Sequence, residues 1–368
     1  MALKYRILLL GVVISIAFLA INTLDVFPLP KDDVLKEKTE EFSGVLRLWI
    51  SEENSPSQGG LASWLTRESE RFEKKHDGVY VQITPVSKET LSAFSYKAEF
   101  PPDMIVFSPG TLSDMQGLVQ TESPSLLKED FKNYASGYCT PIAMGACFWA
   151  VRESADGPLS GKTLLFDRSH LYPGLYALKS DLRYQKAPGM RYGVDLGLPI
   201  YNEEESEITE EAAEIIPGGD SRITENACAS FINGEGNAVF LSHRELSSLI
   251  NASAAPEFEI VMTGEIYADL LSLFAITDTN TAKEKRMCEK FLDHLLSEDA
   301  QKRLESAKAF SVTEAQIYAG KTHYQEIEMF LSAMKIHPAP AFAEEADNVE
   351  SLLEAIIRGN KPLREILP

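Results

Sequence analysis

The stretch that decides the fold is Phe231 to Glu245, which reads FINGEGNAVFLSHRE. Gly234 and Gly236 can adopt positive φ, so they predict that a helix ends here and that the chain reverses. The next residues, 238–241, are all apolar. This run is too short for a helix, and it predicts a buried strand.

A new helix is expected directly after this strand. Ser242 and Glu245 have the spacing of a capping box, in which a hydroxyl and a carboxylate satisfy free backbone N–H groups. A strand that ends at a helix N-terminus creates a polar rim, and open α/β folds hold ligands along such rims. The stretch therefore predicts one wall of a ligand site.

The first third of the chain also alternates strands with helices. Residues 45–50 and 79–84 predict strands, and residues 61–75 between them predict an amphipathic helix. Residues 104–107 predict a third strand, which ends in a turn that contains Gly110. This alternation favours an α/β fold with largely parallel sheets flanked by helices.

Two long apolar segments, residues 139–152 and 266–277, suit strands that cross between two lobes. The chain of 368 residues is long enough for two lobes, since single cores rarely grow beyond a few hundred residues. Hydrophobic residues make up 44% of it and charged residues 24%, which favours a compact fold over disorder. The formal net charge of −20 argues against binding to nucleic acid phosphates.

The N-terminus has the pattern of an export signal or a membrane anchor. Lys4 and Arg6 precede an apolar run, residues 7–21, and no clear small-x-small cleavage site follows. We therefore expect residues 1–24 to be an anchor that is retained or a signal that is cleaved, and residues 25–43 to be a charged tether. The folded body would lie at the extracytoplasmic face of the membrane, or be secreted or periplasmic.

The sequence lacks the motifs of common catalytic and metal sites. It has no GxSxG motif and no phosphate loop, and its six histidines are scattered singly. We therefore predict no enzyme activity, no cofactor and no metal site. The cysteines form no CxxC pair and predict buried free thiols, with one disulfide as the open alternative outside the cytosol. They are Cys139, Cys147, Cys228 and Cys288.

In their order and spacing, these patterns resemble the extracellular solute-binding proteins of ABC importers, family 1, the group that contains maltose-binding protein. The resemblance covers nearly everything from Gly44 to the C-terminus. It is carried by residues 45–50, 102–107, 140–151, 231–241, 295–301 and 358–362. It implies a type II periplasmic-binding-protein fold, with two α/β lobes joined by a hinge and each lobe a mostly parallel sheet flanked by helices.

The resemblance also implies a division of the chain and a function. Lobe 1 would comprise residues 44–142 plus 275–308, and lobe 2 residues 143–270 plus 309–368. The monomeric soluble domain would capture a small polar solute in the cleft, close around it by hinge motion and deliver it to an ABC permease in the membrane. The alternative, which the apolar N-terminus motivates, is a membrane-anchored ligand sensor or regulatory module that kept the fold.

Strand ends and crossover segments supply the candidate ligand-binding residues. Trp149 and Tyr267 suit either aromatic platforms for a ligand or the core, and Glu53 suits solvent as well as a ligand. The full set is Ser51, Glu52, Glu53, Ser108, Gly110, Gly145, Trp149, Arg244 and Tyr267.

Two of these positions differ from the sugar binders that the chain resembles. Arg244 stands where those proteins commonly place a tryptophan that stacks on a sugar ring, and Gly145 stands where the maltose binder has a carboxylate. Arginine favours bidentate contact with carboxylate or phosphate, so the predicted ligand is a carbohydrate, a sugar acid or another polar solute. The alternative for Arg244 is a salt bridge to a neighbouring acidic residue.

Overall fold

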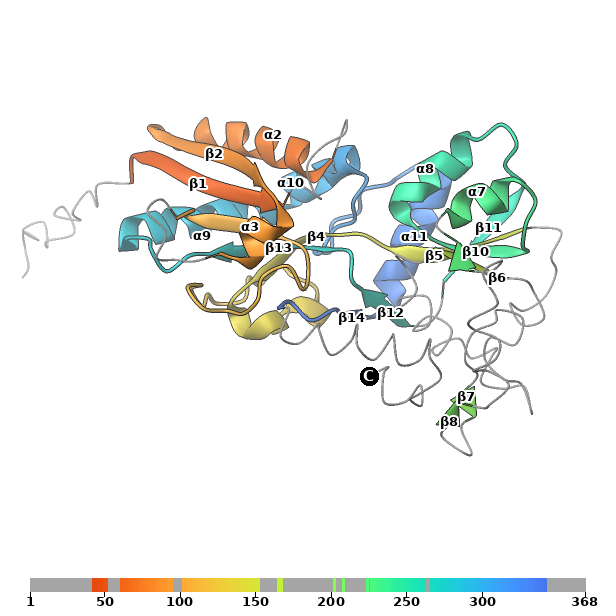
Figure 1. Cartoon of the computed structure of the whole chain (residues 1–368). Helices are drawn as coiled ribbons and strands as arrows, with labels where there is room; N and C mark the ends of the chain where they lie inside the picture. The colour runs from red at the N-terminus through yellow and green to blue at the C-terminus, as the bar shows by residue number, and fades with distance from the viewer. Residues whose placement is uncertain are drawn as a thin grey trace, which may run out of the picture. The chain divides into compact units, whose positions relative to one another are not determined.

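The computed structural model describes nine parts of the chain, shown in colour in Figure 1. The expected anchor and the tether up to residue 41, and with them Glu52 and Glu53, lie outside the described residues. No helix among the described residues is long and apolar enough to span a bilayer. The described parts are residues 42–51, 60–94, 101–152, 164–167, 201–202, 207–208, 223–224, 226–262 and 265–342.

The first sheet has five strands in the order β2-β1-β3-β13-β4. β1 pairs in parallel with β2 and β3, whereas β13 is antiparallel to both β3 and β4, so β13 alone is reversed among these strands. The strands are β1 (Gly44–Ser51), β2 (Val79–Val86), β3 (Met104–Phe107), β4 (Thr140–Met144) and β13 (Leu271–Ile276).

Helices α2 (Leu61–Glu73) and α9 (Ala282–Leu296) pack on the first sheet and on each other. The rings of Phe72 and Phe291 join them edge to face, with centroids 5.0 Å apart. Both side chains are buried, and they belong to the core of this half of the molecule. The short helices here are α3 (Lys88–Ser92), α10 (Glu298–Lys302) and the 3-10 turns η3 (Glu129–Phe131), η4 (Tyr134–Gly137) and η7 (Arg303–Ala307).

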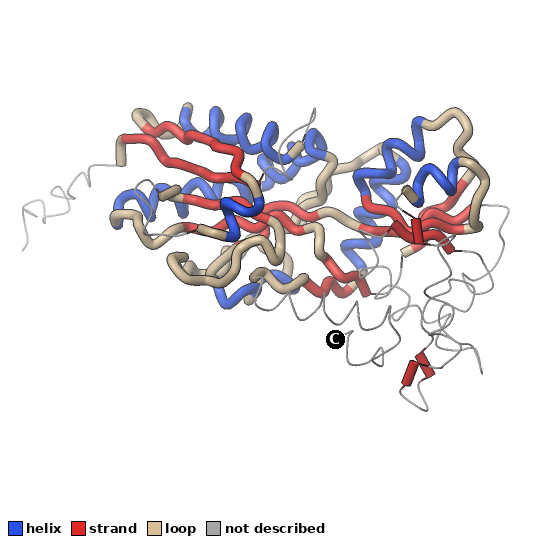
Figure 2. Tube along the Cα trace, in the orientation of Figure 1, coloured by secondary structure: helices blue, strands red, loops and turns tan. Residues whose placement is uncertain are grey.

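The second sheet also has five strands, in the order β11-β5-β10-β6-β9. β5 is antiparallel to both of its neighbours, and the other pairs are parallel, so again a single described strand is reversed. Figure 2 shows the strands of the two sheets as separate groups in the chain trace. The strands are β5 (Cys147–Arg152), β6 (Leu164–Asp167), β9 (Ile223–Thr224), β10 (Ala238–Ser242) and β11 (Phe258–Val261).

The remaining helices and strands lie outside the two five-stranded sheets. α11 packs on β11, and β12 pairs in parallel with β14. Two mostly parallel sheets with flanking helices confirm the predicted α/β class. The elements are α7 (Ala227–Ile232), α8 (His243–Asn251), α11 (Thr322–Ala333), β7 (Tyr201–Asn202), β8 (Glu207–Ile208), β12 (Glu265–Ala268) and β14 (Lys335–Pro338).

The structure confirms the predicted elements of the Phe231 to Glu245 stretch. α7 ends at Ile232, and Gly234 and Gly236 have φ of 99° and 65° in the turn that follows. Every residue of β10 is buried, and α8 begins with the expected capping box. These features depend on residues close together in the chain, which is why the sequence was sufficient to predict them.

The two apolar crossover segments differ from the prediction, since neither is one continuous strand. The first divides into β4 and β5 at Gly145 and Ala146, and the second into β12 and β13 at Asp269 and Leu270. In the first segment the break separates a strand of one sheet from a strand of the other. The break therefore coincides with the change of sheet.

Candidate ligand site and hinge

Three chain segments lie next to one another where the chain passes between the sheets. Met144 and Phe310 exchange two backbone hydrogen bonds, with N···O distances of 3.0 and 2.7 Å. The Gly145 N–H donates to the Leu270 carbonyl at 2.6 Å. We call these three segments, residues 144–147, 269–271 and 308–310, the hinge crossings.

Gly145 is enclosed by the hinge crossings and by His243, the first residue of α8. A Cβ added to Gly145 would lie 2.4 Å from the Cε1 atom of His243 and 2.7 Å from the Cβ atom of Leu270. No real Cβ makes contacts this short, so only glycine fits while these neighbours keep their positions. Gly145 was predicted as a ligand residue from its sequence position. In the structure its N–H donates a hydrogen bond from the first hinge crossing to the second.

Ser51 is the strongest candidate ligand contact among the predicted residues. It ends β1, its side chain is fully buried, and its hydroxyl oxygen has no hydrogen-bond partner within the described part of the chain. A buried hydroxyl without a partner costs about 1–3 kcal/mol of desolvation. A ligand or a water at the carboxyl end of the parallel strands would satisfy it.

The loop after β3 lies at the same edge of the first sheet, because β1 and β3 are parallel neighbours. Ser108 there is half-buried. Gly110 has φ of 70°, which favours glycine, and its N–H donates to the Ala341 carbonyl at 2.9 Å. The structure thus brings Ser51, Ser108 and Gly110 to one edge of the sheet. The Gly110 N–H, however, is already hydrogen-bonded to Ala341, near the C-terminal end of the described residues.

The two predicted aromatic platforms are both buried. Trp149 is 1% exposed and packs on Phe240 of the adjacent strand, with ring centroids 4.9 Å apart. Tyr267 is 7% exposed and pairs with His337 across β12 and β14. In this conformation both residues pack in the interior, which is the second of the two interpretations that the sequence left open.

Arg244 is the second residue of α8, and its side chain is exposed. The Glu245 carboxylate already occupies this helix terminus, because the backbone N–H and the hydroxyl of Ser242 donate to it at 2.8 and 2.9 Å. A ligand anion would therefore have to be held by the Arg244 side chain, not by the helix N–H groups.

Two residues that no sequence pattern singled out, His243 and Gln301, hold the hinge crossings in place. His243 exchanges hydrogen bonds with the backbone of Ala146. The backbone N–H of His243 donates to the Ala146 carbonyl at 2.7 Å, and the ring Nδ1 of His243 accepts from the Ala146 N–H at 3.2 Å. The only sequence signal was a histidine at the first position of a capped helix.

Gln301 is fully buried in α10, and its amide makes four hydrogen bonds. Its Nε2 donates to the carbonyls of Ile142 and Leu295, both at 2.9 Å. Its Oε1 accepts from the Ser311 hydroxyl at 2.8 Å and from the Val312 N–H at 3.3 Å. The amide thus joins β4, just before the first hinge crossing, to the residues just after the third.

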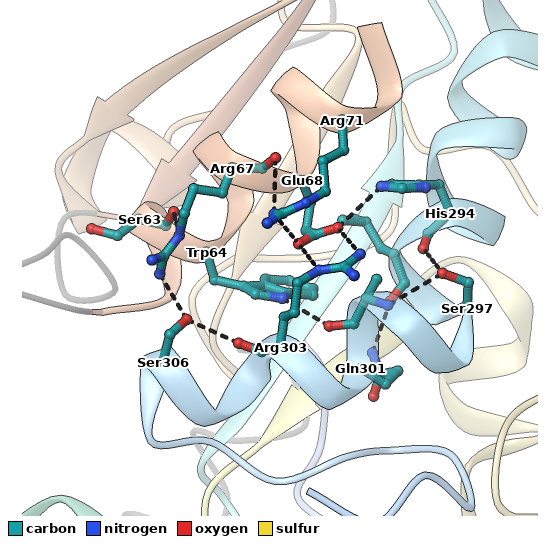
Figure 3. A network of polar contacts seen from close by, with 12 residues as sticks. Ser63, Trp64, Arg67, Glu68, Arg71, His294, Ser297, Gln301, Arg303 and Ser306 are labelled. Carbon is teal, nitrogen blue, oxygen red and sulfur yellow. Dashed lines mark hydrogen bonds and ion pairs between the residues drawn. The ribbon is translucent and has the colours of Figure 1, made fainter. Parts of the chain in front are cut away.

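A second buried polar group, the Glu68 carboxylate of α2, fixes the adjoining turn η7 (Figure 3). Arg303 donates to its two oxygens through Nε and Nη2, each at 2.7 Å, and Arg71 donates to it at 2.8 Å. The Nε2 of His294 lies 3.2 Å from it. Burial alone would raise the pKa of Glu68, but the hydrogen bonds of Arg303 and His294, together with the positive charges of Arg303 and Arg71, outweigh burial and lower the pKa from 4.5 to about 2.

All four cysteines are free and buried in the structure, in agreement with the interpretation as buried thiols. Burial raises the pKa of Cys147 and Cys288, and it raises the pKa of Cys228 to about 11. No cluster of three or more metal-ligating side chains occurs among the residues described.

We expect the thiols to be unreactive in the folded protein, because a thiolate must form and be reached before it can react. At pH 8, a chromogenic thiol reagent should modify no cysteine in native buffer and all four in denaturant. Fewer than four reactive thiols in denaturant without reductant would show that a disulfide had formed.

Comparisons with known proteins agree with this fold. The cyclic α-maltosyl-1,6-maltose binding protein from Arthrobacter globiformis superimposes with a TM-score of 0.56 and 13% identity, over 88% of this chain and 96% of that chain. The GacH receptor of Streptomyces glaucescens, solved with acarbose, superimposes with a TM-score of 0.58 and 14% identity, over 88% of this chain and 95% of that chain.

The substrate-binding protein Lmo0181 from Listeria monocytogenes, in complex with cycloalternan, has a TM-score of 0.56 and 12% identity, over 88% of this chain and 96% of that chain. No protein-family model and no curated protein sequence matches the chain. The structural matches cover most of both chains, so this chain has the type II periplasmic-binding-protein fold that the sequence resemblance implied.

Proposed function

We propose that this protein is the extracytoplasmic solute-binding protein of an ABC importer. It captures a small polar solute, a carbohydrate or a sugar acid, between its two sheets and delivers it to a membrane permease. The observation that carries the proposal is the buried, unpartnered hydroxyl of Ser51 at the carboxyl end of β1, in a fold shared with oligosaccharide-binding proteins. Residues 44–142 plus 275–308 and 143–270 plus 309–368 are the proposed lobes.

The proposal is tested by a thermal-shift screen of the purified full chain. The panel should contain maltotriose, acarbose, chitin oligosaccharides and sugar acids such as glucuronate, with amino acids as the non-carbohydrate arm. A ligand at a hundredfold excess over its Kd should stabilise the fold by about 2.7 kcal/mol. If no carbohydrate in the panel raises the melting temperature, that result would contradict the proposed ligand class.

Ser51→Ala tests the site itself once a ligand is found. Loss of one hydrogen bond should weaken binding about fivefold to tenfold. The matched control is Ser69→Ala, because the Ser69 hydroxyl of α2 is also buried without a described partner but lies away from the strand ends. Both variants should melt close to the wild type, and only Ser51→Ala should lose affinity. If the two variants bound the ligand with equal affinity, Ser51 would not be a ligand contact.

Arg244→Ala separates the two classes of sugar ligand. Arg244 is exposed, so its removal should change the melting temperature of the free protein little. If the ligand is a sugar acid, the variant should lose its ligand-induced shift, whereas a shift produced by a neutral oligosaccharide should persist. Loss of both shifts would mean that Arg244 is needed for more than the charge of the ligand.

A further inference from the structure

One face of α8 is attached to the hinge crossings by two residues. His243 and Ser247 are four positions apart, so they lie one above the other on the helix. His243 contacts the first crossing through its paired hydrogen bonds with Ala146 and through Gly145. Its ring also meets the Phe310 ring of the third crossing at a centroid distance of 5.8 Å.

Ser247 makes the second attachment, also to the third crossing. The Lys308 Nζ donates to the Ser247 hydroxyl at 2.9 Å. Lys308 has φ of 54°, a left-handed conformation that is costly for a residue with a Cβ atom. Such a conformation persists only where the surrounding contacts hold it, and residues of this kind cluster at switch regions.

These contacts join elements that belong to different sheets. α8 directly follows β10 of the second sheet. Lys308 and Phe310 follow η7, which packs on α2, and Phe310 is hydrogen-bonded to Met144 of the first sheet. A rotation of one sheet relative to the other must therefore keep or break the contacts of His243 and Ser247.

We infer that His243, Ser247 and Lys308 form a latch that sets the equilibrium between the open and closed arrangements of the two sheets. This inference rests on the proposed function, in which hinge closure accompanies ligand binding. The latch holds the arrangement in which its contacts are made, so losing them shifts the population toward the other arrangement.

The test is a distance measurement on the full chain without ligand. Lys75→Cys and Ser253→Cys place one label on the loop after α2 and one on the loop after α8, at exposed positions. The native thiols are buried, so the two dyes should attach at the introduced cysteines only. Single-molecule energy transfer then gives the populations of the inter-label distances.

Removal of the latch should change the ratio of these populations. For His243→Ala we expect a change of about tenfold, and for Ser247→Ala about threefold, in line with the usual net strength of hydrogen bonds. Ser248→Ala is the matched control, because Ser248 is the next residue of α8 and is exposed. Lys308→Ala should match Ser247→Ala, and the double variant should add nothing, since both break the same contact.

An unchanged ratio in Ser247→Ala and Lys308→Ala, with wild-type melting temperatures, would overturn the latch. If His243→Ala fails to fold, these two variants decide the question. The measurement needs no ligand, so its outcome is independent of the thermal-shift screen. A failed screen contradicts the proposed ligand class, whereas unchanged distances contradict the latch.

Discussion

Glu68→Ala should lower the free energy of unfolding by about 3–5 kcal/mol, the range for removing one partner of a buried ion pair. The Glu68 side chain is completely buried, and its loss leaves Arg303 and Arg71 without their shared carboxylate. Denaturant unfolding at pH 7, followed by circular dichroism, measures the effect. The matched control is Glu70→Ala on the exposed face of the same helix, which should change stability by less than about 0.5 kcal/mol.

The same carboxylate should make the stability of the protein depend on pH in a defined window. The pKa of Glu68 is about 2 in the fold, below its ordinary value of 4.5. A lowered folded pKa means that the stabilisation is complete above about pH 4.5 and is lost as the pH falls toward 2. The stability difference between the wild type and Glu68→Gln should therefore be constant from pH 6 to 8 and shrink below pH 4.5. A difference that stays constant down to pH 3 would contradict the role of the charge.

Sequence patterns over a few residues were sufficient for the local elements of this fold. The expected capping box at Ser242 is present, and its spacing was visible in the sequence because the partner lies only three residues away. The order of strands within each sheet could not be derived in this way. β13 lies between β3 and β4, although more than a hundred residues separate it from them in sequence, and no local pattern encodes that insertion.

The candidate site was predictable to the same limited extent. Strand ends drew attention to Ser51, whose hydroxyl is buried without a described partner, and its contact with a ligand stays a prediction. The enclosure of Gly145 by His243 depends on tertiary packing between residues far apart in sequence. Glu68 did leave a signal, because it lies four residues from both Trp64 and Phe72 on the apolar face of the predicted helix. A charged residue on such a face needs buried partners, but the sequence does not say which ones.

Gln301→Glu should be among the most destabilising single substitutions in the hinge region, at about 3 kcal/mol or more at pH 8. The amide Nε2 donates to the carbonyls of Ile142 and Leu295, and a carboxylate oxygen in its place would face both acceptors. The carboxylate would also be buried, so its folded pKa should be raised. A raised pKa means that the penalty is largest at high pH and falls as the pH drops and the group becomes protonated.

The measurement is the free energy of unfolding of Gln301→Glu and of the wild type at pH 8 and at pH 5. Both pH values lie above the window in which Glu68 titrates, so the two effects do not overlap. Gln316→Glu is the matched control, because Gln316 is exposed and its substitution should have little effect at either pH. Ser311→Ala removes one of the four hydrogen bonds of Gln301 together with the two that the Ser311 hydroxyl makes with Thr313, and it should cost about 1–3 kcal/mol at both pH values. If Gln301→Glu were no less stable than Gln316→Glu at pH 8, the amide would not be needed to hold β4 to the residues that follow the third hinge crossing, and the backbone pair of Met144 and Phe310 would suffice to join β4 to that crossing.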